Sequence, residues 1–168
     1  MKKQLLTLFT VTAILASCGG DQKVKDTQDT ETETETTLEE SVEANPNSVE
    51  LTGNDQMKFN VSEIRVKAGE PVKLTLRNAG TIVKEAMGHN FVLLKNGTNV
   101  EEFGKASMNS KETDYIPESM KTSIIAHTKL LGPNESDTIT FTLEKGEYDF
   151  ICSFPGHYTT MRGKLIVE

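Results

Sequence analysis

Short apolar runs separated by turn residues are the feature that most limits what residues 48–168 can fold into. Most of these runs have a period of two, and 91–94 is continuously apolar; they lie at 61–67, 72–76, 91–94, 139–143, 148–152 and 165–167. Gly, Pro, Asn and Asp interrupt them, for example at 53–55, 68–71 and 132–134. Because alternation puts apolar side chains on one face of a strand, we expect half-buried antiparallel strands. About eight such strands predict an all-β, two-sheet sandwich or barrel.

Residues 100–123 depart from this pattern. The segment has no period of two, contains Pro117, and carries Phe103, Ala106 and Met108 at roughly helical spacing. We expect an insertion with a short helix packed outside the sandwich.

The first 17 residues predict an export signal rather than a folded element. Two lysines precede a stretch of 12 residues, 5–16, without charge, which ends in Leu15-Ala16-Ser17-Cys18. This ending resembles a bacterial lipobox, so Cys18 is the expected lipidation site; the alternative is an ordinary secretory signal with an incidental cysteine. Gly19, rather than an aspartate, follows Cys18. This favours a lipid-anchored protein of the outer membrane facing the periplasm, with the cell surface as the alternative.

Residues 18–47 are predicted to be an acidic, disordered tether. Positions 19–47 contain nine acidic residues and two lysines, and no spacing of apolar residues would bury a face. A specific acidic docking tail is the alternative. The remaining domain, 48–168, has 16 acidic and 14 basic residues and is nearly neutral. The whole chain carries 18 basic against 25 acidic residues, a balance that excludes a general nucleic-acid binder.

The residues that bring chemistry are concentrated near the C-terminus. Cys152, His157 and Met161 have the spacing C-x4-H-x3-M, and His89 lies far upstream. A thiolate, two imidazoles and a weak thioether are the ligands of a trigonal copper site. Zinc is the competing metal, although structural zinc sites lack a thioether. Each residue alone is more commonly a core or surface residue, but an exported chain rarely keeps an unpaired thiol beside His and Met without a metal.

Four segments of the domain resemble the azurins, the blue copper proteins of the cupredoxin family. They are Gly-Asn-Asp-Gln-Met at 53–57, Met-Gly-His-Asn at 87–90, Ile-Ala-His-Thr-Lys-Leu at 125–130 and Cys-Ser-Phe-Pro-Gly-His at 152–157. The resemblance implies an eight-stranded Greek-key sandwich with a helical flap and one copper ion. It further implies the copper ligands His89, Cys152 and His157, with Met161 as axial ligand and the carbonyl of Gly88 as a weaker axial contact. Asn90 would then hold the ligand loop, and Ser153 would stand where azurins have a hydroxyl or amide.

The sequence also departs from the azurin pattern. No cysteine is available for the family disulfide that joins the N-terminal strand to a neighbour, which would remove about 2–4 kcal/mol of stability. Phe91 occupies the place of a frequent tryptophan, and Asn78 that of a histidine. His127 matches an azurin histidine, and we expect it to be a surface residue without metal.

Three classes of function are compatible with a copper site. In a one-electron shuttle, an edge of His157 would lie in an apolar patch, here called the partner patch, formed by Met57, Met87, Phe154, Pro155 and Gly156. A c-type cytochrome or copper oxidoreductase would dock there transiently, on a monomer. A copper carrier or buffer of the cell envelope is the alternative, but carriers favour exposed Met and His clusters. An enzyme needs an open coordination position and acid–base groups, for which only His127 is left. We therefore favour the shuttle.

Overall fold

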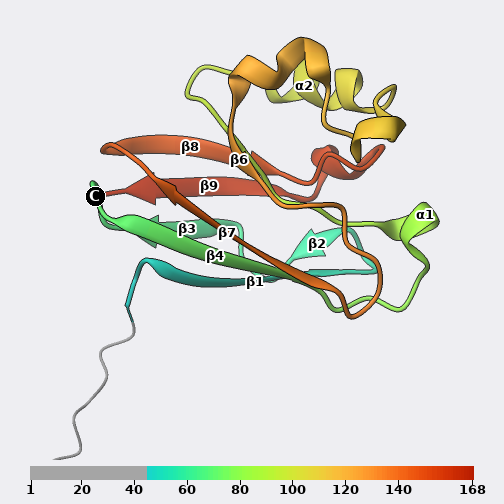
Figure 1. The fold of residues 1–168 in the computed structure, drawn as a ribbon, viewed down its shortest axis with the longest axis horizontal. Coiled ribbons are helices and arrows are strands. Elements are labelled where there is room, and N and C mark those ends of the chain that lie inside the picture. The colour runs from blue at the N-terminus through green and yellow to red at the C-terminus, as the bar shows by residue number, and fades with distance from the viewer. Residues whose placement is uncertain (1–44) are drawn as a thin grey trace, which may run out of the picture. The chain divides into compact units, whose positions relative to one another are not determined.

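Two β-sheets and a helical segment outside one of them make up the part of the chain that the computed structural model describes, residues 45–168 (Figure 1). The first sheet has the order β2-β1-β4-β7, with β1 Ser48–Asn54, β2 Lys58–Phe59, β4 Pro71–Asn78 and β7 Ser136–Thr142. The second has the order β3-β9-β8-β5-β6, with β3 Glu63–Val66, β5 Val92–Leu94, β6 Ile124–His127, β8 Gly146–Ile151 and β9 Arg162–Val167. The predicted signal peptide, Cys18 and the tether up to residue 44 lie outside the described residues. At Asn47 the prediction of a disordered tether was wrong, because this residue is buried and accepts a hydrogen bond from the N–H of Lys67 at 2.7 Å. No helix in the described part is long and apolar enough to cross a membrane.

The predicted all-β, two-sheet sandwich is confirmed, with nine strands in the described residues rather than about eight. The expectation of antiparallel strands was partly wrong. Strand β1 pairs with β4 in parallel, Ser48 opposite Lys73, and β3 pairs with β9 in parallel, Glu63 opposite Lys164. Alternation of side chains is the same in parallel and antiparallel strands, so the pattern carried no information on direction.

The apolar faces of the two sheets share one core. Leu51, Leu74 and Leu76 from the first sheet meet Phe150 and Leu165 from the second, and all five are fully buried. Phe91, at the position of the frequent tryptophan, is also fully buried, and its ring stacks on Phe150 with centroids 5.4 Å apart. This packing fixes the ends of β5 and β8. The candidate metal ligand His89 lies before β5, and the candidate ligand Cys152 directly follows β8.

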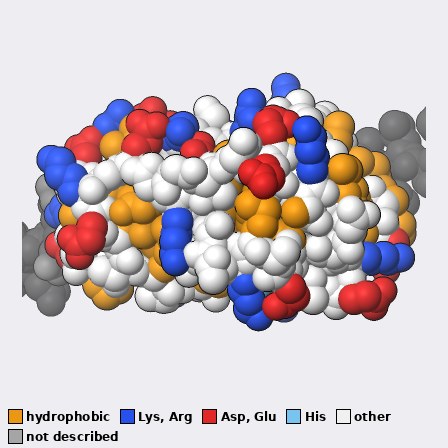
Figure 2. All heavy atoms as spheres, turned by 90° about the horizontal axis from the view of Figure 1, so that it is seen from above, with side chains coloured by type: hydrophobic (Ala, Val, Ile, Leu, Met, Phe, Trp, Pro, Cys, Tyr) orange, Lys and Arg blue, Asp and Glu red, His pale blue; other side chains and the backbone are white. Residues whose placement is uncertain are grey.

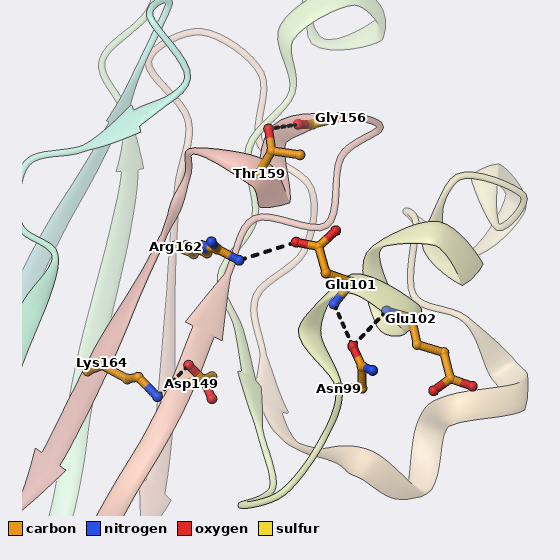
Figure 3. Close-up of polar contacts among 8 residues, drawn as sticks. All are labelled: Asn99, Glu101, Glu102, Asp149, Gly156, Thr159, Arg162 and Lys164. Atoms are coloured by element: carbon orange, nitrogen blue, oxygen red, sulfur yellow. Dashed lines mark hydrogen bonds and ion pairs between the residues drawn. The ribbon is translucent and has the colours of Figure 1, made fainter.

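The predicted helical insertion is also present. Helix α2, Val100–Ser107, is followed by two short 3-10 helices, η1 Lys111–Thr113 and η2 Glu118–Ser123. Asn99 begins α2 by accepting hydrogen bonds from the backbone N–H groups of Glu101 and Glu102 (Figure 3). The buried residues of α2 are Phe103, Gly104 and Ser107. Met108 follows the helix and is 45% exposed, so the expected apolar spacing was wrong at this residue.

Helix α2 lies against η3 (His157–Thr159), the segment that begins with a candidate ligand. Gly104 permits this contact, because a Cβ at that position would overlap the ring of Tyr158. An ion pair between Glu101 and Arg162, at 3.4 Å, also joins α2 to the start of β9, shortly after η3 (Figure 3). The insertion therefore supports the ligand loop from outside the sandwich.

Candidate metal centre

Three side chains with metal-binding atoms converge between the ends of the strands. His89 lies between α1 (Lys84–Met87) and β5, Cys152 directly follows β8, and His157 begins η3. Their ligand atoms all lie within 4.8 Å of one another, and Cys152 Sγ is 3.5 Å from His157 Nδ1. His89 and Cys152 are 0% exposed and His157 is 2% exposed. The structure thus brings Cys152 together with His89, which lies 63 positions earlier in the chain, and with His157, which lies 5 positions later.

The imidazole of His89 is held in one orientation. Its Nε2 lies 3.0 Å from the carbonyl oxygen of Asn54, at the end of β1. Because a carbonyl only accepts, Nε2 carries the hydrogen and Nδ1 keeps the lone pair. Nδ1 is buried and has no hydrogen-bond partner in the described part of the chain. A buried, unpartnered acceptor is costly, and a metal ion bound at Nδ1 removes that cost.

Burial keeps the site uncharged in the absence of a cation. It raises the pKa of the Cys152 thiol to about 12, and it lowers the pKa of His157 to about 4, with the neighbouring charge of His89 as a second cause. It also lowers the pKa of His89. Both imidazoles are therefore neutral at pH 7, as metal ligation requires. A cation at the site favours the thiolate, which the buried thiol otherwise resists.

Met161 brings a thioether to the same place. The side chain is 0% exposed, its N–H donates to the carbonyl of His157 at 2.7 Å, and its carbonyl accepts from the N–H of Cys152 at 2.9 Å. A Cβ on Gly53 would lie 2.7 Å from Met161 Cε and 2.9 Å from His89 Cδ2. Both side chains are therefore packed against the backbone of residue 53, and any side chain larger than that of glycine would clash with them.

Gly88 lies directly before His89 and is buried. A Cβ at this position would lie 2.7 Å from the carbonyl oxygen of Lys84 and 3.0 Å from Leu130 Cγ. Glycine is thus required where α1 ends and the chain turns toward the centre.

Asn90 connects three segments around the centre. Its Oδ1 accepts a hydrogen bond from the N–H of Ser153 at 2.8 Å, and its Nδ2 donates to Ser153 Oγ at 2.8 Å. The same Nδ2 donates to the carbonyl of Asp114 at 3.2 Å. The contact to Asp114 was missed by sequence reasoning, because Asp114 lies in the insertion, where no periodic pattern indicates its neighbours.

The residues of the partner patch differ in exposure. Met57 is 37% exposed, and its carbonyl accepts from Thr160 Oγ1 at 3.2 Å. Met87 and Pro155 are partly exposed and Gly156 is exposed, but Phe154 is only 7% exposed. The ring of Phe154 packs on His157 with centroids 4.7 Å apart. Phe154 therefore contributes more to the interior of the loop than to its surface.

Two exposed apolar residues near α1 were not anticipated. Ile82 is 39% exposed and Val83, directly before α1, is 61% exposed. Both precede α1, the helix that ends at Met87 of the partner patch. His127, by contrast, is exposed at the end of β6, where its Nδ1 lies 3.0 Å from the carbonyl of Thr128, and it is not among the grouped metal-binding residues.

The donor atoms fit copper. A thiol, two imidazoles and a thioether are soft or borderline ligands, and no carboxylate belongs to the group found among the described residues. A family model described as copper binding proteins of the plastocyanin/azurin family matches residues 46–168. This chain belongs to that family. Its cofactor is copper, as the ligand spacing predicted.

Curated relatives of this plastocyanin/azurin family member include two kinds of protein. Azurin of Pseudomonas aeruginosa is 40% identical over 129 residues, which are 72% of this chain and 84% of that protein. Outer membrane protein H.8 of Neisseria meningitidis serogroup B is 39% identical over 117 residues, which are 67% of this chain. The chain spans 62% of the length of that relative.

Solved structures show the same fold for this family member. Dithionite-reduced auracyanin from Roseiflexus castenholzii is 32% identical, with a TM-score of 0.65 over 73% of this chain and 97% of that one. An azurin from Methylomonas sp. strain J is 29% identical, with a TM-score of 0.65 over 72% of this chain and 97% of that one. The resemblance to azurins is thus confirmed in sequence and in fold.

Proposed function

We propose that this chain is a one-electron carrier with a blue copper site. His89 Nδ1, Cys152 Sγ and His157 Nδ1 would hold the copper ion, with the thioether of Met161 and the carbonyl of Gly88 as weaker ligands. Bound copper supplies the one-electron couple between Cu(I) and Cu(II). The observation that carries the proposal is the convergence of an unpartnered, buried imidazole nitrogen with a buried thiol and a second imidazole.

The surrounding chain suits electron transfer because it holds the ligands independently of the ion. The carbonyl of Asn54 orients His89, and Asn90 hydrogen-bonds to both the backbone and the hydroxyl of Ser153. The backbone N–H of Cys152 donates a hydrogen bond to the carbonyl of Met161. A site that keeps one geometry in both oxidation states loses little energy to rearrangement. Burial of all the ligands also supports a carrier of electrons over a carrier of copper, which must release its ion.

A visible spectrum of the full-length protein with one equivalent of copper tests this function. The oxidised protein should be blue, because a thiolate on Cu(II) gives an intense charge-transfer band, and it should bleach with ascorbate. Cys152→Ser should be colourless. The matched control His127→Ala removes an exposed histidine outside the centre and should stay blue. A colourless wild type that holds stoichiometric copper would contradict the proposal.

We further propose that the domain works in the cell envelope, lipid-anchored through Cys18 to the outer membrane and facing the periplasm. Support comes from the lipobox-like segment and from the Neisseria relative, whose name describes an outer membrane protein. Residues 1–17 are the signal peptide in this proposal, and the tether runs from Cys18 to the residues before the buried Asn47. Full-length protein should partition into detergent, whereas Cys18→Ala should stay in the aqueous phase. Equal partitioning of the two would exclude acylation.

The proposed partners are redox proteins, such as c-type cytochromes or copper oxidoreductases, that meet a monomer of this chain transiently. They would dock over the exposed part of the partner patch, Met57, Met87, Pro155 and Gly156, beside the ligand His157. Small contact areas are typical of such brief encounters.

A further inference from the structure

Two consecutive residues beside the centre have an unusual backbone. Asp114 has φ +53° and Tyr115 has φ +63°, both in the left-handed region. Aspartate adopts this region at moderate cost, but for a bulky residue such as tyrosine it is a true outlier. A strained pair persists only where the surrounding structure determines it, and such pairs concentrate at functional sites.

Hydrogen bonds from three positions hold this turn. The N–H of Tyr115 donates to the carbonyl of Ser110 at 2.9 Å, and the N–H of Asp114 donates to the carbonyl of Lys111 at 3.2 Å. The carbonyl of Asp114 accepts from Asn90 Nδ2 at 3.2 Å. Since Asn90 also accepts a hydrogen bond from the N–H of Ser153, it connects the turn to the loop that carries Cys152.

The turn places the ring of Tyr115 on that of Phe154. The two rings meet edge to face, with centroids 5.0 Å apart and an interplanar angle of 67°. Phe154 in turn packs on the imidazole of His157, at 4.7 Å. Tyr115 is 8% exposed and belongs to the same apolar cluster as Cys152, Met161 and Phe154. A continuous row of rings thus leads from the strained turn to a candidate copper ligand.

Phe154 needs this support, because there is space next to it. A cavity of about 150 Å³ is bordered by both rings and by residues of α1, η1 and the loop after β6; its lining is Lys84, Glu85, Lys111, Asp114, Tyr115, Leu130 and Phe154. A cavity beside a ring lets that ring tilt, unless another contact restrains it. Tyr115 lines this cavity together with Phe154, and its ring, 5.0 Å from that of Phe154, supplies that contact.

We propose that Tyr115 is a positioning residue for His157: held by the left-handed turn at 114–115, it keeps Phe154 against the imidazole and thereby fixes the orientation of that ring. The inference rests on the proposed function only in taking His157 as a copper ligand. The effect itself belongs to the protein and does not require the ion.

The test compares Tyr115→Leu with Tyr115→Phe in the full-length chain. Cys18→Ala is used as the background, so that Cys152 is the single thiol, and the protein is kept metal-free. Tyr115→Leu should increase the rate at which a small disulfide reagent labels Cys152 by about fivefold or more, since the loop opens more often. It should also broaden the ring resonances of His157. Tyr115→Phe keeps the ring and should stay within about twofold of the wild type.

Tyr148→Leu is the matched control, because it truncates a partly buried tyrosine on β8 outside the cluster of the metal centre. It should change neither readout. If it increases labelling as much as Tyr115→Leu does, Tyr115 acts only through global stability and the proposal fails. The wild type gives an independent measurement: proton contacts by NMR between Tyr115 and Phe154, and between Phe154 and His157, are expected, and their absence would overturn the proposal even if Tyr115→Leu does not fold.

A copper-loaded comparison separates this inference from the function. With copper bound, Tyr115→Leu should alter the copper hyperfine splitting in the EPR spectrum while Tyr115→Phe restores the wild-type value. A wild type that is never blue would refute the proposed function, yet leave the labelling and NMR results to decide on Tyr115.

Discussion

At the scale of single residues, Gly53 shows how closely the centre is packed. It lies in β1, yet its missing side chain makes room for Met161 and His89, which come from distant parts of the chain. Gly53 belongs to the segment that resembles azurins, but the sequence alone does not indicate which side chains need the space.

Gly53→Ala should move the thioether of Met161 away, because the new Cβ would lie 2.7 Å from Met161 Cε, and it should also shift the imidazole of His89, whose Cδ2 would lie at 2.9 Å. Overpacking of this kind costs about 1–3 kcal/mol of stability. If Met161 is the weak copper ligand proposed above, its loss disfavours Cu(II), so the reduction potential should rise while the protein stays blue. Redox titration and thermal unfolding measure the two effects. Gly146→Ala, whose new Cβ would meet nothing closer than 3.4 Å, should change neither.

Asn47 provides a noncovalent link at the start of the N-terminal strand. Its side chain is 2% exposed; Oδ1 accepts from the N–H of Lys67 at 2.7 Å, and Nδ2 donates to the carbonyl of Lys67 at 3.2 Å. The residue directly before β1 is thereby joined to the turn before β4. The sequence did not predict these hydrogen bonds, which join the two segments without a disulfide.

Asn47→Ala should lower the free energy of unfolding by about 1–3 kcal/mol, since it leaves the Lys67 groups without their partner. Urea denaturation of the metal-free protein measures this value. Asn96→Ala removes an exposed asparagine from the turn after β5 and should have an effect within about 0.5 kcal/mol. Equal losses in the two variants would show that Asn47 does not link the strand.

At the scale of elements, the contact between α2 and η3 decides how the ligand loop is supported. Gly104 faces Tyr158, and Tyr158 directly follows His157. The position of the insertion along the chain could be predicted from its missing period of two. Its docking partner could not, because that contact joins residues 54 positions apart through a close approach of a glycine to a ring.

Gly104→Ala should destabilise the protein, although alanine favours a helix over glycine by about 1 kcal/mol. The reason is that the added Cβ overlaps the Tyr158 ring, so that either α2 or η3 must shift. Thermal unfolding should show a lower midpoint, and the visible band should shift because His157 moves with Tyr158. Glu102→Ala, an exposed substitution on the same helix, should leave both unchanged.

Asp55 joins the turn between β1 and β2 to the loop before α1. Its carboxylate accepts from the backbone N–H of Thr81 at 2.9 Å, from Thr81 Oγ1 at 2.9 Å and from the N–H of Ile82 at 3.4 Å. The hydrogen bond from the Thr81 backbone is the largest cause that lowers the pKa of Asp55 below its ordinary 3.8. A lowered pKa in the folded state means that protonation favours the unfolded chain.

The stabilisation from Asp55 should therefore be complete above its unfolded pKa of 3.8 and disappear as the pH falls through the lower, folded value. Asp55→Asn should unfold at a lower temperature than the wild type at pH 6, and the gap should narrow below pH 4. Glu112→Gln, in the exposed η1, should unfold at the same temperature as the wild type at both pH values. A gap for Asp55→Asn that does not depend on pH would show that the charge is irrelevant.

At the scale of the whole domain, the metal lies at one end of the sandwich and the chain enters at the other. Strand β1 runs from Ser48, next to Asn47, to Asn54, whose carbonyl orients His89. The alternating runs predicted the two layers, and the C-x4-H-x3-M spacing predicted three of the clustered residues because they share one short loop. That His89 joins them follows from the resemblance and the fold, since nothing local connects positions 89 and 152.

The surface charge of the domain gives little guidance to an approaching partner. Residues 48–168 carry 16 acidic and 14 basic side chains, and acidic and basic groups are interspersed on the face seen in Figure 2. Long-range steering by such a surface is weak. We therefore propose that the specificity of docking arises at short range, from the exposed apolar residues at the metal end.

Electron exit through the metal end gives the last prediction. A charge introduced there has to lose its hydration whenever two molecules dock, and an unpaired charge is costly to desolvate. Met87→Lys should therefore slow electron self-exchange by about tenfold, which corresponds to about 1.4 kcal/mol in the activation free energy, with little change in the visible spectrum. Thr142→Lys adds the same charge on an exposed position of β7, opposite Pro71 and hence at the far end from the metal. Because both variants have the same net charge, a slowing that is confined to Met87→Lys comes from docking at the metal end. NMR line broadening in mixtures of oxidised and reduced protein measures the rates, and an equal slowing in both variants would show that electrons do not leave beside His157.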